Sequence, residues 1–383
     1  MILLIELFLP NLKSVRNRIE SGIKGNNMAE NIPVQLTTQP RAKQPADQLG
    51  FGKYFADHMF TAEYDHGVWK NAKIQPYGPL AMEPGASVFH YGQAMFEGMK
   101  AFRGASGKIH LFRPEFHAKR IAEGAKRLCM PSIPQDLFLN AIEQLVKLDQ
   151  TWIPTAKDSA LYLRPTLIGT ESFLGVRPSE KYLFFIITSP VGAYYAEQFA
   201  PVKIWIEDKL IRAAAGGLGA TKAAANYAAS LQASTQAKKK NYSQVLWLDA
   251  AEHKFIEEVG TMNVFFRIND EIITPSLDAG SILAGATRDC VIQILKDWNL
   301  KVTERKISLQ EIIEAQKNGS LKEMFGTGTA AVISPVGLLA NDHYNLPINN
   351  GLVGEVTQKL HTEISGIQSG TIADRHNWVK ILN

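Results

Sequence analysis

The chain has 383 residues, of which 45% are hydrophobic and 20% charged, a composition typical of a globular protein with a sizeable core. Lysine and arginine total 41 against 37 for aspartate and glutamate, and a net charge of +4 is too small to indicate a nucleic-acid-binding or membrane-surface protein. The two cysteines, Cys129 and Cys290, exclude a disulfide scaffold and a cysteine-built zinc site, and favour a reducing compartment such as the cytoplasm.

The N-terminal segment differs from the rest of the chain. Residues 1–10 are apolar but contain Glu6, and the basic residues follow this stretch, whereas in a secretory signal they precede it. A stretch of this length is also too short to span a bilayer as a helix. A transit peptide and translation from an upstream start are the two alternatives. We favour the second, with Met28 opening the natural chain, and expect residues 1–27 to lie outside the fold.

The first half of the chain mixes strand and helix patterns. Residues 28–50 are polar and predict an extended arm, and short alternating segments with glycine breaks follow it. The predicted strands include 86–91, 160–164 and 182–188, and the predicted amphipathic helices are 114–128 and 137–148. The stretch 189–195 then interrupts the pattern with proline and glycine, which indicates an interdomain linker.

The second half has the same mixture of elements. Its predicted strands are 202–207, 245–248 and 262–268, and its predicted helices are 221–240 and 286–298. Strands and helices in both halves favour an α/β or α+β protein of two domains. The predicted divisions are an extension and arm over 1–50, a smaller domain over 51–188, a linker over 189–200 and a larger domain over 201–383.

Three short motifs are weak when each is taken alone. The segment 326–331 matches a loose dinucleotide fingerprint, but little room remains for a preceding strand and a nearby proline would break the following helix, so we reject nicotinamide binding. Its glycines and threonines still suit a tight loop that faces an anion. The acidic pair Glu257 and Glu258 also fits a solvated turn. Ala286-Thr287 opens a helix, whose amides suit a phosphate or an ordinary cap.

Lys222 follows the glycine-rich segment 216–219 at a predicted junction between loop and helix. A solvated surface lysine is the ordinary alternative. The small residues around Lys222 leave room for a flat ligand beside the amine, and a desolvated lysine has a lowered pKa and can form a Schiff base. The nine histidines lack the spacing of metal ligands, so no metal site is predicted.

Six segments, taken together and in this order, resemble one family. They are Phe96–Lys100, Leu161–Pro165, Gly216–Tyr227, Gln244–Leu248, Glu258–Asn263 and Phe325–Thr329. This series resembles the branched-chain amino acid aminotransferases, which are pyridoxal-phosphate enzymes of fold type IV, and the match extends from about residue 51 to residue 378. The resemblance implies a two-domain α/β (α+β mixed) enzyme with its active site at the domain interface, acting as a homodimer.

The resemblance also implies a role for individual residues around the cofactor. Lys222 is implied to bind pyridoxal phosphate covalently and later to move a proton. Glu258 is implied to bind the pyridine nitrogen, which keeps the ring an electron acceptor, and Tyr227 the ring hydroxyl. The residues implied to hold the phosphate are Arg120, Ala286, Thr287 and Thr329.

On the substrate side, Thr329 and Ala330 are implied to offer amides to the substrate carboxylate. The implied side-chain pocket consists of Phe51, Tyr91, Phe96, Tyr162 and Thr261, closed by Val176 of a neighbouring subunit. Arg164 lies two residues beyond Tyr162 on a predicted strand, so we expect it on the same face, where it meets the second carboxylate of glutamate. A structural arginine paired with an acid is the alternative.

The resemblance therefore implies reversible ping-pong transfer of the amino group of leucine, isoleucine or valine to 2-oxoglutarate, giving glutamate and the branched 2-oxo acid. The expected partners are these small molecules and a second copy of the chain, with no nucleic acid and no membrane. D-amino acid aminotransferase and aminodeoxychorismate lyase are the alternatives within the fold, and a non-catalytic binding protein is the alternative outside it. Ala331–Ser334 replaces the Cys-x-x-Cys pair of mammalian members, so their thiol switch is expected to be absent.

Overall fold

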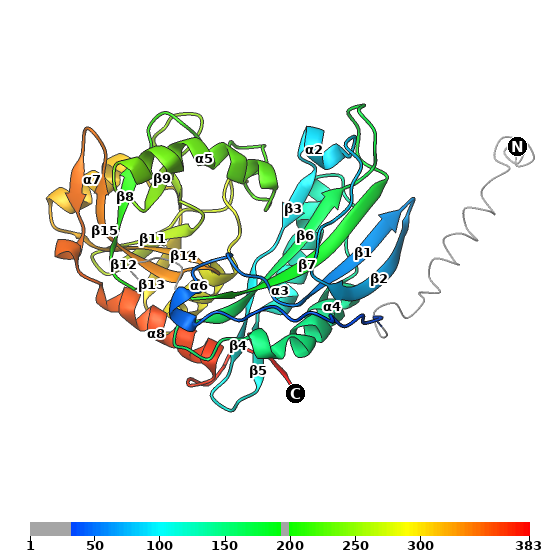
Figure 1. Ribbon diagram of the computed structural model, residues 1–383. Coiled ribbons are helices and arrows are strands. Elements are labelled where there is room, and N and C mark those ends of the chain that lie inside the picture. The colour runs from blue at the N-terminus through cyan, green and yellow to red at the C-terminus, as the bar shows by residue number, and fades with distance from the viewer. Residues whose placement is uncertain (1–31, 193–198) are drawn as a thin grey trace, which may run out of the picture.

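The computed structural model describes residues 32–192 and 199–383 as two lobes, each built on one β-sheet with helices against it (Figure 1). The chain leaves the first lobe after β7 (Lys181–Val191) and builds the second. Its C-terminal end then returns to the first lobe, because β17 (Val379–Leu382) pairs antiparallel with β5 (Ile109–Phe112). This mixed arrangement of two sheets and seven helices among the described residues confirms the predicted fold class.

The first sheet is antiparallel throughout, in the order β17-β5-β4-β6-β7-β1-β2, with β3 beside β6. Its other strands are β1 (His58–Asp65), β2 (Val68–Pro76), β3 (Ala94–Phe96), β4 (Met99–Arg103) and β6 (Ala160–Gly169). The predicted helices are confirmed as α3 (Pro114–Arg127) and α4 (Gln135–Leu148). Their apolar stripes join the sheet in one core that includes Phe60, Ile121, Phe138 and Phe184, each fully buried. Removing this surface from water stabilises the lobe.

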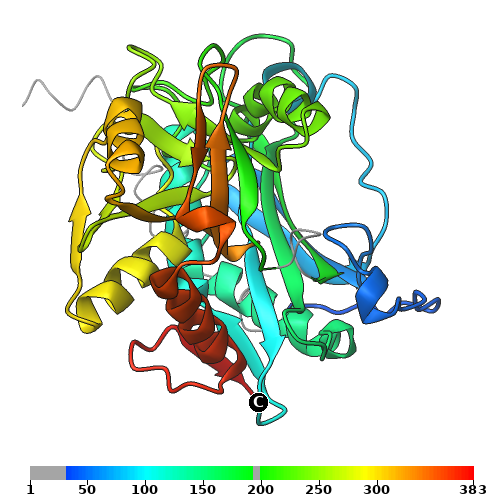
Figure 2. The same cartoon turned by 90° about the vertical axis from the view of Figure 1, so that its left-hand side faces the viewer.

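The second sheet is mixed, in the order β10-β9-β8-β15-β14-β11-β12-β13, with β16 beside β15. Its strands are β8 (Val202–Ile206), β9 (Gln244–Leu248), β10 (Ile256–Val259), β11 (Asn263–Ile268), β12 (Glu271–Thr274), β13 (Lys301–Glu304), β14 (Leu321–Gly328), β15 (Val332–Ala340) and β16 (Asn345–Pro347). Its helices are α5 (Ala224–Lys239), α6 (Ala286–Asp297), α7 (Leu309–Lys317) and α8 (Glu355–Ser369). Figure 2 brings α6 (yellow), α7 (orange) and α8 (red) to the front of the molecule.

Two predictions of local structure were wrong. The segment predicted as a strand at 86–91 is a short helix, α2 (Ser87–Tyr91), which Gly92 ends in the left-handed conformation. So short an apolar run fits either period, and the chain here turns away from the sheet. The segment at 326–331 does follow a strand, since β14 runs to Gly328. No helix follows it; the chain turns into β15, and this supports the rejection of a dinucleotide fold.

The predictions for the N-terminus concern residues largely outside the described part of the chain. Residues 1–27 and the proposed start at Met28 are among those that the structure does not describe. From residue 32 the predicted arm is described, and Val34 forms a β-bridge with Ile74 in the edge strand β2. This part of the arm therefore extends the rim of the first sheet.

The predicted domain division stays a prediction. The first sheet continues to Val191, so it extends past the predicted end of the smaller domain at residue 188. The predicted linker over 189–200 includes residues 193–198, which lie outside the described part. In the ranges that the structure describes, no helix is long and apolar enough to cross a membrane.

Candidate active site

A cavity of about 260 Å³ lies between the two lobes. Side chains and loops from both sheets line it, so the predicted site at the lobe interface is present as a physical space. Eleven of the predicted site residues line this cavity: Phe51, Phe96, Arg120, Tyr162, Arg164, Lys222, Tyr227, Thr261, Ala286, Thr329 and Ala330. A smaller cavity adjoins it, and the two share Tyr227, Thr261, Asn263 and Leu283. Sequence segments more than 200 residues apart therefore meet around one space.

Lys222 lies in the turn just before α5, as predicted, and its amine enters the cavity. Its carbonyl accepts a hydrogen bond from the Phe96 amide at 3.2 Å, and Ala223 bridges to Met95, so the turn is fixed against β3. The Lys222 Nζ donates to the Tyr227 hydroxyl at 2.7 Å. Burial, together with the charge of Arg120, lowers the pKa of Lys222 to about 8. At pH 7 an amine with this pKa is neutral in roughly one molecule in ten, about 300-fold more often than an ordinary lysine, and the neutral form is the nucleophile.

Glu258 lines the adjoining cavity and is 4% exposed. It follows an irregularity in the pairing of β10 with β9, and its carboxylate accepts a hydrogen bond from the Leu283 amide at 2.9 Å. The guanidinium of Arg212 lies 3.3 Å away and is itself buried. Burial raises the pKa of Glu258, while the charge of Arg212 opposes that rise. The neighbouring Glu257 instead accepts a hydrogen bond from Ser281, and it lines neither cavity.

The end of the cavity near α6 is suited to an anion. Ala286 is the first residue of α6, and the N-cap residue Gly285 provides no side-chain cap, so amides of the first turn remain available to a ligand. Thr287 is buried in the same turn. Thr327 also lines the cavity, and within the described residues its buried hydroxyl has no hydrogen-bond partner. Sequence reasoning missed Thr327, although it belongs to the same threonine-rich motif as Thr329.

Arg120 reaches this end of the cavity from α3 and is held by a fully buried carboxylate. Its Nε and Nη2 donate to Glu97 at 2.6 and 2.7 Å, and its Nη1 donates to the Ala284 carbonyl at 2.8 Å. Glu97 also contacts His117 at 2.7 Å. Burial would raise the pKa of the Glu97 carboxyl, but the charges and hydrogen bonds of Arg120 and His117 lower it far below its usual range. The anionic Glu97 therefore orients the guanidinium, which has five N–H donors, toward the cavity.

The remaining wall of the cavity combines aromatic rings with a cation. The Phe51 and Tyr162 rings meet edge to face at 4.9 Å. Tyr162 and Arg164 both lie on β6 and both line the cavity, as their spacing predicted. The Arg164 guanidinium lies 4.4 Å from the Phe96 ring centroid and donates to the Tyr162 hydroxyl at 3.1 Å.

Tyr91 and Val176 are not brought to the cavity of this chain. Tyr91 is 41% exposed at the end of α2, where its hydroxyl donates to the Leu174 carbonyl. Val176 is 87% exposed in the loop between β6 and β7. The expectation that Tyr91 lines the pocket is thus wrong for a single chain, because its side chain is held at the surface by the contact with Leu174 and is not among the residues that line the cavity. In the described ranges no group of three or more potential metal ligands occurs.

Sequence reasoning missed Glu97 and Arg212, and for different reasons. Glu97 is part of a recognised segment, so its place between Phe96 and Gly98 was a usable signal. Arg212 lies in a loop after β8 with no motif around it, and it is marked by its ion pair with Glu258 and its hydrogen bond to the Ser281 carbonyl. Each holds a predicted site residue in place: Glu97 holds Arg120, and Arg212 holds Glu258. Such a role depends on contacts that exist only in the folded chain.

Comparisons with known proteins identify the family. The amino-transferase class IV family model matches residues 94–339. The chain is 51% identical over 351 residues to branched-chain-amino-acid aminotransferase 2 of Bacillus subtilis, covering 91% of this chain and 96% of the relative. A solved branched-chain amino acid aminotransferase of Escherichia coli superposes with a TM-score of 0.70 at 24% identity, over 85% of this chain and 98% of that one.

A second solved structure, the branched-chain amino acid aminotransferase from Thermobaculum terrenum in its PLP-form, gives a TM-score of 0.69 at 24% identity, over 85% of this chain and 98% of that one. The family model covers well over half of the chain, and the Bacillus subtilis relative is matched almost from end to end. The cavity, its half-buried lysine and its anion-binding end therefore belong to a chain that is a member of the class IV aminotransferases.

Proposed function

We propose that this chain is a pyridoxal-phosphate-dependent branched-chain amino acid aminotransferase. It transfers the amino group of leucine, isoleucine or valine to 2-oxoglutarate in a reversible ping-pong reaction, giving glutamate and the branched 2-oxo acid. The observation that carries the substrate assignment is the wall of Phe51, Phe96 and Tyr162 with the Arg164 guanidinium among the rings. An apolar wall accepts leucine, whereas a second carboxylate needs a buried partner. The names of the relatives support the branched-chain amino acids as substrates.

The residues present fit pyridoxal phosphate. A buried amine, a buried carboxylate and an anion site are the three features that its aldehyde, ring nitrogen and phosphate require. They occur here as Lys222, Glu258 and the first turn of α6 with Arg120, all on connected cavities. The unpaired hydroxyl of Thr327 is one buried polar group that a phosphate would satisfy. When bound, the cofactor supplies an aldehyde that takes up the amino group and a ring that accepts electrons from the substrate's α-carbon.

Each residue has a distinct task in the proposed reaction. Lys222 would hold the cofactor's aldehyde through its amine and would move the proton of the substrate's α-carbon. The lowered pKa of its amine supports both tasks, because a neutral amine accepts a proton. Glu258, paired with Arg212, would hold a proton at the ring nitrogen. Tyr227, whose pKa burial raises to about 12, stays a phenol that hydrogen-bonds the ring hydroxyl.

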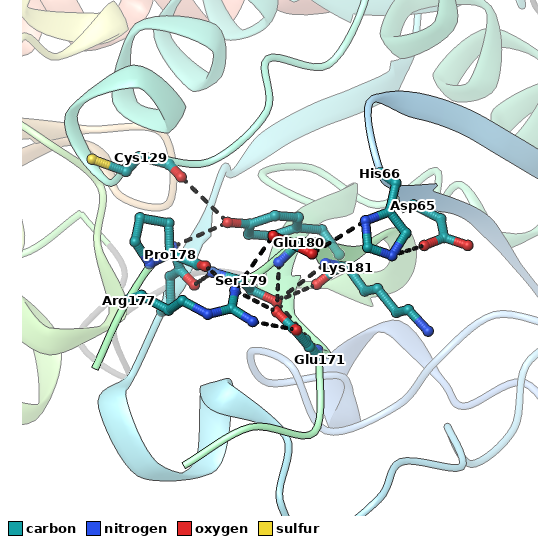
Figure 3. A network of polar contacts seen from close by, with 11 residues as sticks. Asp65, His66, Cys129, Glu171, Arg177, Pro178, Ser179, Glu180 and Lys181 are labelled. Carbon is teal, nitrogen blue, oxygen red and sulfur yellow. Dashed lines mark hydrogen bonds and ion pairs between the residues drawn. The ribbon is translucent and has the colours of Figure 1, made fainter. Parts of the chain in front are cut away.

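We further propose a homodimer in which the loop between β6 and β7 closes the pocket of a second copy. Phe173, Leu174 and Val176 project from this loop with exposed side chains. The loop itself is firmly built: Glu171 accepts two hydrogen bonds from Arg177, at 2.7 and 3.1 Å, and one from the Glu180 amide (Figure 3). Exposed apolar side chains on an ordered loop are suited to contact with another protein surface, here that of a second copy of the chain. Light scattering of the purified protein measures the dimer directly.

A location in the cytoplasm is proposed on the free thiols. Cys290 is buried, Cys129 is exposed, and the two are not joined in a disulfide. Free cysteines are typical of a reducing compartment.

The proposed reaction is tested by following the visible absorbance of the cofactor in the purified enzyme. Leucine, isoleucine, valine and glutamate are expected to convert the bound cofactor to its amine form, and branched 2-oxo acids and 2-oxoglutarate to restore it. D-Alanine is the control for the D-amino acid alternative, and Lys222→Ala is the control for the covalent link. Conversion by D-alanine but not by leucine would refute the substrate assignment. The absence of any cofactor absorbance would support a non-catalytic binding protein.

A further inference from the structure

We propose that Lys100 is a positioning residue for the α-carboxylate of the substrate. The Lys100 amine holds the turn 329–332 by a hydrogen bond to the Ala330 carbonyl. It also supplies a buried positive charge next to that turn. This inference rests on the proposed function and adds a residue to which the sequence motifs assigned no role.

Lys100 leaves the first sheet on the face that looks toward the cavity. It lies on β4 directly opposite Tyr162 on β6, and opposite residues of an antiparallel pair point to the same face. Gly98 shares that face two residues earlier, and a Cβ atom there would lie 1.9 Å from the Tyr162 hydroxyl. Glycine therefore lets Tyr162 lie against β4, and Lys100 extends beside it to donate to the Ala330 carbonyl at 2.7 Å.

The turn that Lys100 holds is a thin wall between two spaces. Ala330 and Ala331 line both the active-site cavity and a second cavity of about 860 Å³, and Lys100 lines the second one. The turn is also strained, because Val332 has a φ of 61°. A β-branched residue in the left-handed region costs about 1 to 3 kcal/mol and persists only where its surroundings hold it. The bond from Lys100 is one of the contacts that hold this backbone in place.

Lys100 is a buried cation that lacks an anionic partner in the described chain. Its side chain is 6% exposed, and within residues 32–192 and 199–383 no carboxylate lies within 4.0 Å of its amine. Burial lowers the pKa of Lys100 to about 8, and the charge of Asp158 opposes this shift, so the amine is largely protonated at neutral pH. Buried charges are otherwise found paired. An anion on the cavity side of the turn would supply the missing partner.

The α-carboxylate is the anion that every substrate carries. Amino acids and 2-oxo acids all have it, whereas a side-chain carboxylate occurs only in glutamate and 2-oxoglutarate. The proposal therefore separates two cations by their effects. Loss of Lys100 weakens the binding of all substrates alike, whereas loss of Arg164 weakens the binding of the acidic substrates.

The test uses the holoenzyme and two matched probes, 4-methylpentanoate and 4-methylpentanamide, which differ in the charge of the head group. Calorimetry gives the Kd of each for the wild type, Lys100→Met, Lys100→Arg and the control Lys108→Met, which removes an exposed lysine near the same sheet. We expect Lys100→Met to raise the Kd of the acid about 10- to 100-fold, since the lost charge acts on the carboxylate through the turn in a buried site, and to leave the Kd of the amide within a factor of about three. KM for leucine and for glutamate should rise by the same factor.

Lys100→Arg keeps the charge and is expected to keep the preference for the acid over the amide, as is Lys108→Met. Equal losses for acid and amide in Lys100→Met would show a role in packing alone and overturn the proposal, as would an unchanged acid Kd. If Lys100→Met does not retain cofactor, Lys100→Gln, which keeps a donor for Ala330 without the charge, decides by the same ratio. A wild type that transaminates other amino acids but not leucine would overturn the branched-chain assignment only. The acid-to-amide ratio is then measured with the side chain that the enzyme accepts.

Discussion

Replacing Arg164 by methionine tests how one cavity accepts both apolar and acidic side chains. Within the described residues no carboxylate lies within ion-pair distance of Arg164, and its buried Nε has no hydrogen-bond partner. Its contacts are the Phe96 ring, the Tyr162 ring at 5.2 Å and the Tyr162 hydroxyl. A structural arginine paired with an acid, the alternative considered from the sequence, is therefore disfavoured. The guanidinium keeps planar donors for a carboxylate.

The magnitude follows from the burial of the site. Removing one member of a buried charge pair costs about 3 to 5 kcal/mol, and the partial exposure of Arg164 reduces that figure. We expect Arg164→Met to lower kcat/KM for glutamate and 2-oxoglutarate roughly 30- to 1000-fold, which corresponds to a loss of about 2 to 4 kcal/mol of transition-state stabilisation. For leucine, Arg164→Met removes only the cation–π contacts of the guanidinium with the aromatic rings of the wall, which are worth about 0.5 to 1 kcal/mol. The leucine half-reaction should therefore slow by about fivefold or less.

Single-turnover absorbance of the bound cofactor measures each half-reaction separately. Arg103→Met is the matched control, because it removes the same charge from the same sheet at a residue that does not line the active-site cavity. It is expected to leave the ratio of glutamate to leucine rates unchanged. Equal losses in both half-reactions of Arg164→Met would show that Arg164 supports the fold and would refute this reasoning.

Three further predictions concern protonation and redox chemistry. Glu258→Gln should retain the cofactor but slow the leucine half-reaction by about 100-fold or more, since a neutral amide does not hold a proton at the ring nitrogen; a larger effect from Glu257→Gln would contradict the assignment. In the cofactor-free protein, the pKa of Lys222 is lowered, so between pH 8 and 10.5 the unfolded chain binds more protons than the folded one. The free energy of unfolding of the wild type should therefore rise over that range relative to Lys222→Met, by on the order of 2 kcal/mol. Urea unfolding at several pH values measures this difference. A difference that does not vary with pH would argue against a desolvated amine. Peroxide should leave activity largely intact, because burial raises the pKa of Cys290 to about 12 and Ala331–Ser334 contains no thiol; rapid inactivation reversed by a dithiol would implicate Cys129.

The sequence by itself determined the elements and the chemistry that depend on local order. Lys222 could be singled out because small residues and a helix start surround it, and a helix start depends on neighbouring residues. The single strand that carries Tyr162 and Arg164 was likewise predictable, and its period-two spacing places both side chains on one face. The prediction of a strand at 86–91 was wrong because the pattern of this short segment fits a strand and a helix equally well.

Only the tertiary structure decided which side chains act together. Lys100 and Ala330 are 230 positions apart, and no local pattern predicts that a lysine on β4 meets a carbonyl beyond β14. The ion pair of Arg212 with Glu258 and the return of β17 to β5 have the same origin. Such contacts arise when two sheets pack and exclude water, because a buried charge must then find a partner wherever the fold supplies one. The local sequence therefore predicted the reacting groups, and packing selected the residues that orient them.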